Sequence, residues 1–274
     1  MAKIGFIGLG NMGAKMATNL LNGNCEVIGY DINENFVKDL LPIGLKKATN
    51  LNDISDESDL VITMLPNGNI VEEVYDNIID KIKPGTLLVD CSTIDVEKAN
   101  ELHKKCKNKK LLSLDAPVSG GVGGAEQATL TFMVGGTEEA YKIMLPFFDI
   151  MGKKSLLCGS SGSGQATKAC NNMLLATTMI GVGEAFALGN NLGLDPNKLF
   201  EILSTSTGSC WAINNYCPIE GVGPKSPADN NFQPGFSVDL MHKDLSIALK
   251  AIESTKTSAP FGTKAEENFK RMVN

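Results

Sequence analysis

The sequence has few of the residues that mark several common classes of protein. It contains two histidines, His103 and His242, and neither has a partner at metal-ligand spacing, so no metal site is expected. Lysine and arginine number 25 against 31 acidic residues, which gives a net charge of −6. Nucleic acids and anionic membranes need a basic face, so this balance argues against both as partners.

Long apolar runs are also missing. The uncharged stretch at the start of the apolar segment, 169–183, is shorter than the roughly 18 residues of a membrane span and contains Asn and Thr. The N-terminus passes directly from MAK into GFIG, without the features of a signal or transit peptide. We therefore expect a soluble, cytoplasmic protein. A mitochondrial matrix protein whose presequence had been removed would look the same.

Cysteine pairing is not indicated either. The seven cysteines are odd in number and form no CxxC pair, and several lie within apolar runs such as LLVDCS and KSLLCG. This pattern is typical of reduced, buried thiols in a reducing compartment.

What is present predicts two domains, because 274 residues exceed the roughly 150 of one domain. Short apolar runs alternate with helix-like segments over the first 160 residues. The runs are KIGFIG, EVIGYD, DLVITML, TLLVDCS and KLLSLDAP, and TLTFMVGG and KKSLLCG follow. Strands that alternate with helices form a parallel sheet covered on both faces. We therefore predict a Rossmann-type, doubly wound α/β domain over residues 1–160.

The alternation of strand-like and helix-like segments ends after Gly159, and no further strand is indicated beyond it. A long helix is predicted over 164–190, and because it is apolar on all sides we expect it to be buried. Further helices are predicted after Asp195, over 238–255 and near the C-terminus. We therefore predict an all-helical substrate and oligomerisation domain over 161–274. The connection at 207–235 is longer than most loops, which is typical of functional or disordered segments.

GFIGLGNMG places Gly8, Gly10 and Gly13 between a predicted strand and a predicted helix. Such glycines permit a tight turn, the approach of a pyrophosphate and close helix packing, and the helix N-terminus attracts phosphate. Asp31 ends the next strand, 23 residues after Gly8, where an acid binds the ribose hydroxyls. An aspartate repels a 2′-phosphate, which favours NAD over NADP. The alternative is a simple glycine turn with Asp31 as a helix cap. The predicted cofactor-binding residues of this segment are Gly8, Gly10, Asn11, Met12, Gly13 and Asp31.

Two further strand ends are predicted to face the cofactor, because ligands of open α/β sheets lie beyond the carboxyl ends of the strands. Leu65 and Pro66 follow the third apolar run, and Thr93 follows the fourth. Without the glycine motif, each would be interpreted as an ordinary strand-to-helix turn.

Ser119, Gly120 and Gly121 follow the strand that ends in DAPV. Small residues there expose backbone N–H groups that hold a carboxylate. A flexible glycine loop is the alternative.

Lys168 stands at the start of the apolar helix, and Asn172 follows one turn later on the same face. An amide holds a hydroxyl or carbonyl oxygen, and a lysine exchanges its proton. Burial disfavours the ammonium and is expected to lower the pKa of Lys168 toward neutrality. The alternative is a lysine that extends along the helix to solvent.

Together GFIGLGNMG, DAPVSGG and the spacing Gly164-x3-Lys168-x3-Asn172 resemble the β-hydroxyacid dehydrogenase family across nearly the whole chain. The segment from Cys210 to Val222, with SPADNNF and GF after it, is similar to the branch that oxidises 3-hydroxyisobutyrate with NAD to methylmalonate semialdehyde in valine catabolism. The resemblance implies Lys168 as general acid/base, Asn172 on the reacting oxygen, and Ser119, Gly120 and Gly121 on the carboxylate. It also implies Trp211 and Phe236 as walls of the substrate pocket and Lys243, supported by Asp244, near the nicotinamide.

The resemblance further implies a homodimer or homotetramer. Two alternatives stay open: an NADP-dependent reductase of glyoxylate or another short semialdehyde in the same family, and a non-catalytic NAD-binding scaffold. Asp31 and the Cys210–Val222 segment argue against the first, and the presence of Lys168 with Asn172 argues against the second.

Overall fold

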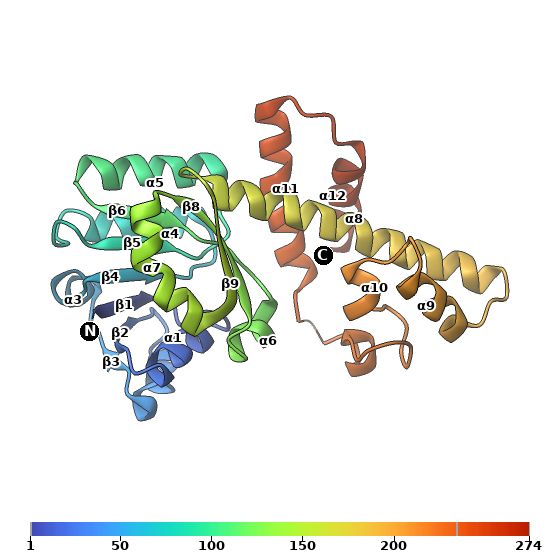
Figure 1. Ribbon diagram of the computed structural model, residues 1–274, viewed down its shortest axis with the longest axis horizontal. Helices are drawn as coiled ribbons and strands as arrows, with labels where there is room; N and C mark the ends of the chain where they lie inside the picture. Colours follow the sequence, from blue (N-terminus) through green and yellow to red (C-terminus); the bar gives the residue numbers. More distant parts are fainter. Residues whose placement is uncertain (1, 234, 274) are drawn as a thin grey trace. The chain divides into compact units, whose positions relative to one another are not determined.

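The computed structural model describes residues 2–233 and 235–273 and divides into two compact units, Met1–Lys168 and Ala169–Asn274 (Figure 1). The first unit holds all strands of the described residues, and the second is helical. The predicted α/β fold with a helical C-terminal region is confirmed.

The strands of the first unit form one mixed sheet in the order β3-β2-β1-β4-β5-β6-β8-β7, with β9 paired to β8. All pairs from β3 to β6 are parallel, whereas β8 is antiparallel to both β6 and β7. The prediction of a parallel sheet therefore holds up to β6 and is wrong at β8. No long crossover helix separates β6 from β8, and short connections join antiparallel strands. The bounds are β1 (Lys3–Ile7), β2 (Glu26–Tyr30), β3 (Lys46–Lys47), β4 (Leu60–Thr63), β5 (Leu87–Asp90), β6 (Leu112–Asp115), β7 (Val118–Ser119), β8 (Leu130–Gly136) and β9 (Gly152–Gly159).

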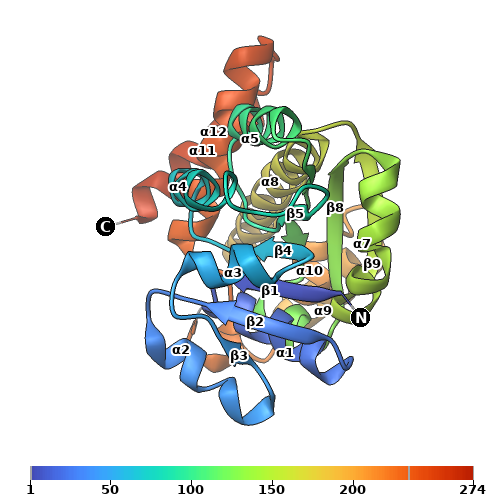
Figure 2. The same cartoon turned by 90° about the vertical axis from the view of Figure 1, so that its left-hand side faces the viewer.

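Both faces of this sheet are covered by helices (Figure 2). Side chains alternate between the faces with the period of two expected of a strand. In β1, Ile4 and Phe6 join the cluster under α1 (Gly13–Asn22) and α7 (Glu138–Met151), whereas Ile7 joins the opposite cluster. That second cluster lies under α3 (Leu51–Glu57), α4 (Gly68–Ile78) and α5 (Val96–Asn108). Burial on both faces explains why these strands are almost continuously apolar.

Some short elements were not predicted. They are the 3-10 turn η1 (Leu41–Ile43), the helix α3 and the helix α6 (Gly121–Glu126), whereas α2 (Glu34–Lys38) is a shorter form of the helix predicted over 33–41. The helix α6 begins within the predicted Ser119-Gly120-Gly121 turn, since Gly120 is its N-cap and Gly121 its first residue. Helices this short carry too little periodic pattern to be recognised from sequence.

The second unit is organised around α8 (Ser163–Asn191), whose first turns belong to the first unit. One apolar cluster joins α8 to α9 (Pro196–Thr205) and α10 (Trp211–Asn215), and another joins it to α11 (Val238–Thr255) and α12 (Pro260–Met272). The helix predicted after Asp195 is α9, and the side chain of Asp195 caps it by accepting the N–H groups of Asn197 and Lys198. The long connection contains α10 and the 3-10 turn η2 (Pro227–Asn230).

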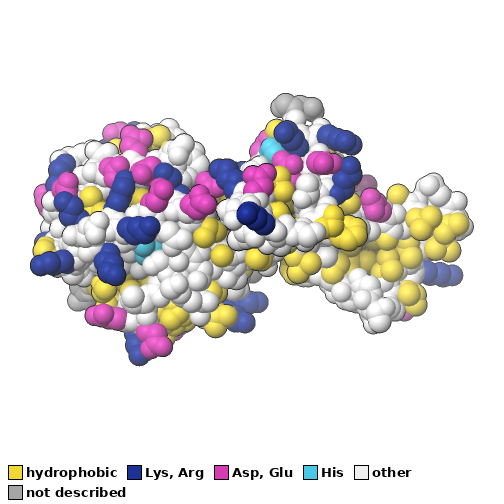
Figure 3. Space-filling view, turned by 90° about the horizontal axis from the view of Figure 1, so that it is seen from above, with side chains coloured by type: hydrophobic (Ala, Val, Ile, Leu, Met, Phe, Trp, Pro, Cys, Tyr) yellow, Lys and Arg dark blue, Asp and Glu magenta, His cyan; other side chains and the backbone are white. Residues whose placement is uncertain are grey.

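The expectation that α8 is buried is wrong for the single chain. Leu174 and Leu188 are 64% and 61% exposed, and Figure 3 shows hydrophobic side chains gathered on the surface of the second unit. By length and composition alone α8 could also cross a membrane, and 28% of its most apolar window is buried. One such helix is weak evidence for a span, because core helices of other proteins pass the same test.

All seven cysteines are free thiols. Cys91, Cys106 and Cys217 are buried as expected, whereas Cys170 is exposed. Burial raises the pKa of the Cys106 thiol to about 11, which keeps it protonated and unreactive at neutral pH.

Candidate active site

Two glycines of the first motif are required by the packing of the protein itself. Gly8 has φ +94°, and a Cβ there would lie 2.3 Å from the carbonyl oxygen of Met64. A Cβ on Gly13 would lie 1.9 Å from the carbonyl oxygen of Gly8. Gly10 differs, because a Cβ there would meet nothing within 4 Å. The space above Gly10 is therefore open, as the approach of a pyrophosphate requires.

The N-terminus of α1 is suited to binding an anion. Met12 occupies the N-cap position without a side-chain cap bond, and the first turn holds no acidic residue. Asn11 is exposed, and Met12 is half-buried against the core. The first N–H groups of α1 are thus not capped by a side chain, and the partial positive charge of the helix end favours phosphate.

Asp31 joins the end of β2 to the glycine turn. Its Oδ2 accepts the N–H of Leu9 at 2.7 Å, and its Oδ1 accepts the N–H of Asn33 at 2.7 Å. The side chain of Asn33, rather than that of Asp31, caps α2 by accepting from Asn35. A carboxylate has about four acceptor positions, so two remain for ribose hydroxyls.

The loops after β4 and β5 are joined to each other. The N–H of Leu65 donates to Ser92 Oγ at 2.8 Å, and Pro66 lies exposed beside this contact. The N–H of Ser92 in turn donates to Asp90 Oδ1 at 3.1 Å. Thr93 follows Ser92 and is half-buried. The predicted cofactor contacts Leu65 and Thr93 therefore lie on two loops that the bond between Leu65 and Ser92 holds together.

Lys168 is buried, with 8% of its surface exposed, and its Nζ donates to the carbonyl oxygen of Val118 at 2.8 Å. The alternative of a lysine that extends to solvent is therefore wrong. Val118 precedes Ser119, and Gly120 and Gly121 follow with φ +136° and +63°. The amine thus lies against the strand end that carries the predicted carboxylate loop.

In the second unit the buried Asn172 is held by an acid. Its Nδ2 donates to Asp244 Oδ2 at 2.5 Å, and its Oδ1 accepts from Asn171 Nδ2 at 2.9 Å. Lys243 Nζ lies 3.4 Å from Asp244 Oδ1. Asp244 therefore links the two polar residues that were predicted from α8 and α11.

The predicted aromatic residues lie in two places. Trp211 stacks on Tyr216 with ring centroids 5.6 Å apart and is 55% exposed. Phe236 packs against the cluster that contains Ala176 of α8 and Met241 of α11. Gly235 approaches Tyr216, since a Cβ there would lie 3.2 Å from Tyr216 Oη, so the segments of Trp211 and Phe236 meet at that tyrosine.

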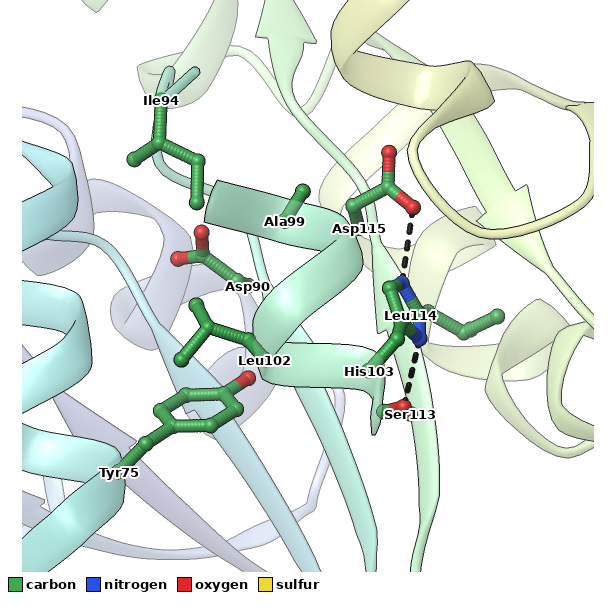
Figure 4. Close-up of a pocket in the computed structure, with 9 residues that line it drawn as sticks. All are labelled: Tyr75, Asp90, Ile94, Ala99, Leu102, His103, Ser113, Leu114 and Asp115. Atoms are coloured by element: carbon green, nitrogen blue, oxygen red, sulfur yellow. Dashed lines mark hydrogen bonds and ion pairs between the residues drawn. The ribbon is translucent and has the colours of Figure 1, made fainter. Parts of the chain in front are cut away.

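Sequence reasoning missed the residues that hold the first turn of α8. Both oxygens of the buried Asp115 are engaged: Oδ1 accepts the N–H of Gly162 at 2.8 Å, and Oδ2 accepts the N–H of Gln165 at 2.9 Å. His103 bridges Asp115 and Ser113, with Nε2 3.0 Å from Asp115 Oδ1 and Nδ1 2.6 Å from Ser113 Oγ (Figure 4). An acid at a strand end was the available signal for Asp115. A lone amide in the first turn of an apolar helix was the signal for Gln165.

Comparisons with known proteins agree over the full chain. Residues 3–159 match the family described as the NAD binding domain of 6-phosphogluconate dehydrogenase. Residues 162–274 match the family described as NAD-binding of NADP-dependent 3-hydroxyisobutyrate dehydrogenase. A probable 3-hydroxyisobutyrate dehydrogenase of Mycobacterium bovis is 43% identical over 273 residues, which cover 100% of this chain and 93% of that protein.

Two further relatives extend this likeness. The mitochondrial 3-hydroxyisobutyrate dehydrogenase of Rattus norvegicus is 44% identical over 274 residues, which cover 99% of this chain and 82% of that protein. A solved structure of the Mycobacterium tuberculosis 3-hydroxyisobutyrate dehydrogenase with L-serine superposes with a TM-score of 0.96 at 42% identity. The match covers 100% of this chain and 94% of that one.

Proposed function

Because this chain belongs to the 3-hydroxyisobutyrate dehydrogenase family, we propose that it oxidises 3-hydroxyisobutyrate with NAD to methylmalonate semialdehyde. The observation that carries this proposal is the placement of Lys168. Its amine is buried and bonded to the carbonyl of Val118, directly before the Ser119-Gly120-Gly121 turn. A proton acceptor and an anion-binding turn are thereby adjacent, as a hydroxyacid substrate requires.

The chain offers a fitting site for NAD. The open space above Gly10 and the uncapped start of α1 suit the pyrophosphate, with Asn11 and Met12 in the same turn. Asp31 would accept bonds from the ribose hydroxyls and repel a 2′-phosphate, which favours NAD although the second family is described for an NADP-dependent enzyme. Leu65, Pro66 and Thr93 at the edge beyond β4 and β5 would contact the rest of the cofactor. When bound, NAD supplies the hydride acceptor.

The residues of this chain would bind, orient and deprotonate the substrate. Ser119 and the N–H groups of Gly120 and Gly121 would hold the carboxylate, which fixes the position of the C3 hydroxyl. Unprotonated Lys168 would accept the hydroxyl proton as the C3 hydride leaves, and the resulting ammonium would return it in the reverse direction.

Asn172 would direct the reacting oxygen. The amide has two N–H donors, and one of them is engaged by Asp244 Oδ2. The bond to Asp244 fixes the amide plane, so the second donor is oriented before substrate arrives. A pre-oriented donor strengthens its bond to the oxygen as charge develops there, without reorganisation during the reaction.

The remaining residues of the second unit would shape the pocket. Trp211 and Phe236 would form its apolar wall, and Lys243, beside Asp244, would lie toward the nicotinamide. We also propose that the protein assembles as a homodimer or homotetramer. Exposed leucines on and after α8 support this assembly, because monomers rarely leave large apolar patches in water: Leu174, Leu188, Leu192 and Leu194. We place the protein in the cytoplasm, with the mitochondrial matrix as the alternative.

The first experiment is a substrate panel read as NADH or NADPH formation. The substrates are 3-hydroxyisobutyrate, 3-hydroxypropionate, 4-hydroxybutyrate, glycolate and serine, each with NAD and with NADP. Preference for 3-hydroxyisobutyrate with NAD supports the proposal. Preference for another hydroxyacid keeps the family and refutes the substrate. NAD binding without turnover of any substrate would favour the non-catalytic scaffold.

A further inference from the structure

Gln165 is buried and uses both ends of its side-chain amide. Only 1% of its surface is exposed. Its Oε1 accepts the N–H of Ile94 at 3.1 Å, and its Nε2 donates to the carbonyl oxygen of Ser92 at 2.7 Å. Gln165 has no part in the proposed proton transfer or in the proposed binding of the carboxylate.

The two backbone groups bound by Gln165 lie on either side of Thr93. The amide therefore pairs with the backbone around Thr93 as a neighbouring strand would pair with it. The same loop is fixed from the other side, because Ser92 Oγ accepts the N–H of Leu65 and Ser92 N–H donates to Asp90. One side chain thus immobilises the segment that carries a proposed cofactor contact.

On the helix side Gln165 belongs to the first turn of α8. Its own N–H donates to Asp115 Oδ2 at 2.9 Å, so the backbone at this position is anchored as well. Lys168 follows three residues later, about 4.5 Å along the helix axis. Because a helical turn is stiff, the position of Gln165 determines where the Lys168 side chain starts.

We propose that Gln165 is a positioning residue of the reaction, which holds the loop around Thr93 in fixed register with the turn of α8 that carries Lys168. This inference rests on the proposed function, since Thr93 and Lys168 are its cofactor contact and its proton acceptor. Proton and hydride leave the same carbon–oxygen unit, so their two acceptors must be aligned together. A displacement of about 1 Å costs about 10²-fold in rate.

Burial alone does not require an amide here. An apolar side chain of the same length would fill the space, but it would leave the Ser92 carbonyl and the Ile94 N–H buried without this partner. Satisfied buried amides fix one arrangement where apolar contacts allow several. The role inferred for Gln165 is therefore geometric, and it predicts effects on the chemical step rather than on affinity.

The test compares Gln165→Met and Gln165→Glu with the wild-type enzyme. Methionine matches the length and removes both bonds. We expect kcat to fall about 10- to 100-fold with Gln165→Met, in line with misplacement of less than about 1 Å, while KM for 3-hydroxyisobutyrate changes less than about threefold. We also expect a larger deuterium isotope effect on kcat with substrate deuterated at C3, because hydride transfer becomes more rate-limiting.

Gln165→Glu supplies a second readout. An ionised carboxylate accepts from Ile94 but faces the Ser92 carbonyl without a donor, whereas a protonated carboxyl donates to it. The activity of Gln165→Glu relative to wild type should therefore rise as pH is lowered from 8 to 6. If Gln165→Met does not fold, the pH profile of Gln165→Glu tests whether Gln165 is a positioning residue.

Two controls separate positioning from stability. Gln127→Met changes an exposed glutamine after α6, and Ile54→Val removes a methylene from a buried site on α3. Both should keep the wild-type kcat and isotope effect, and Ile54→Val should do so despite lower stability. Folded Gln165 variants with wild-type kcat, isotope effect and pH profile would overturn the inference alone. A wild-type protein inactive on every hydroxyacid would overturn the proposed function, and the inference with it.

Discussion

Asp90 is predicted to make the unfolding free energy of this protein fall as pH rises between about 4 and 6. Its carboxyl is buried at the end of β5, and burial raises its pKa from 3.8 to about 6. Hydrogen bonds to Oδ1 from Thr63 Oγ1 at 2.8 Å and from the N–H of Ser92 oppose this shift, and the nearby Asp115 adds to it. Oδ2 has no hydrogen-bond partner among the residues that the structure describes.

The sign follows from proton binding. Between the two pKa values the folded protein keeps the Asp90 proton, whereas the unfolded chain releases it. The unfolded state therefore binds fewer protons, and stability decreases as pH rises until both states are ionised above about pH 6. A shift of about two pH units is worth about 3 kcal/mol in total, of which about 2 kcal/mol falls between pH 4.5 and 7.5.

The assay is urea unfolding of wild type and Asp90→Asn at pH 4.5 and pH 7.5 without cofactor. Asparagine is isosteric, stays neutral and retains an oxygen for Thr63 and Ser92. From pH 4.5 to pH 7.5 the unfolding free energy of wild type should fall by about 2 kcal/mol more than that of Asp90→Asn. Subtracting the variant from wild type cancels the contributions of the other titrating groups. Asp53→Asn is the control: hydrogen bonds from Thr49 lower the pKa of the half-buried Asp53, so its carboxyl is ionised in both the folded and the unfolded chain over most of the interval. Equal pH dependence in wild type and Asp90→Asn would refute the reasoning.

Three further predictions concern the proposed function. Lys168→Ala should lower kcat by about 10²- to 10⁴-fold while NAD affinity, measured by calorimetric titration, stays near wild type; lost NAD binding or retained turnover would contradict the assigned role. Asp31→Asn should raise kcat/KM for NADP relative to NAD at least about tenfold, or about 1.4 kcal/mol of removed repulsion, and an unchanged ratio in the kinetic assay would count against Asp31 as the discriminating group. Leu188→Asp, at a position 61% exposed in the single chain, should shift the protein to a smaller species in light scattering, and an unchanged mass would remove this leucine from the proposed interface.

Long segments with a strong period were predictable because burial on two faces imposes a simple pattern. β1, β4 and β5 are apolar at nearly every position, and α8 begins and ends within one residue of its predicted bounds. The antiparallel step at β8 was not predictable, because a strand buried on both faces has the same composition in either direction. Strand direction depends on connections, and here the connection is the short segment of β7 and α6.

The residues of the candidate site also fall into some that were predictable from the sequence and others that were not. Gly8, Asp31, Lys168 and Asn172 stand out in the sequence because each is an exception within a periodic segment. Their supports do not stand out, because a buried Gln165 or a backbone carbonyl such as that of Val118 becomes visible only once the chain is folded. The exposed face of α8 was misjudged for a related reason: an apolar helix shows that its surface avoids water, but not whether the same chain covers it.

The burial of Lys168 also explains why its supports are polar rather than apolar. A lysine amine with the proposed role of exchanging protons needs one fixed hydrogen-bond acceptor to orient it. The carbonyl of Val118 at 2.8 Å supplies that acceptor, from the strand that precedes the proposed carboxylate turn. The helix that carries the lysine must then be fixed relative to the same strand, which Asp115 achieves by taking the N–H groups of Gly162 and Gln165. Directional bonds thus fix both ends of the lysine side chain: the Val118 carbonyl holds the amine, and Asp115 holds the first turn of the helix that carries the residue. Apolar packing is non-directional and would not define the position of the amine to a fraction of an ångström.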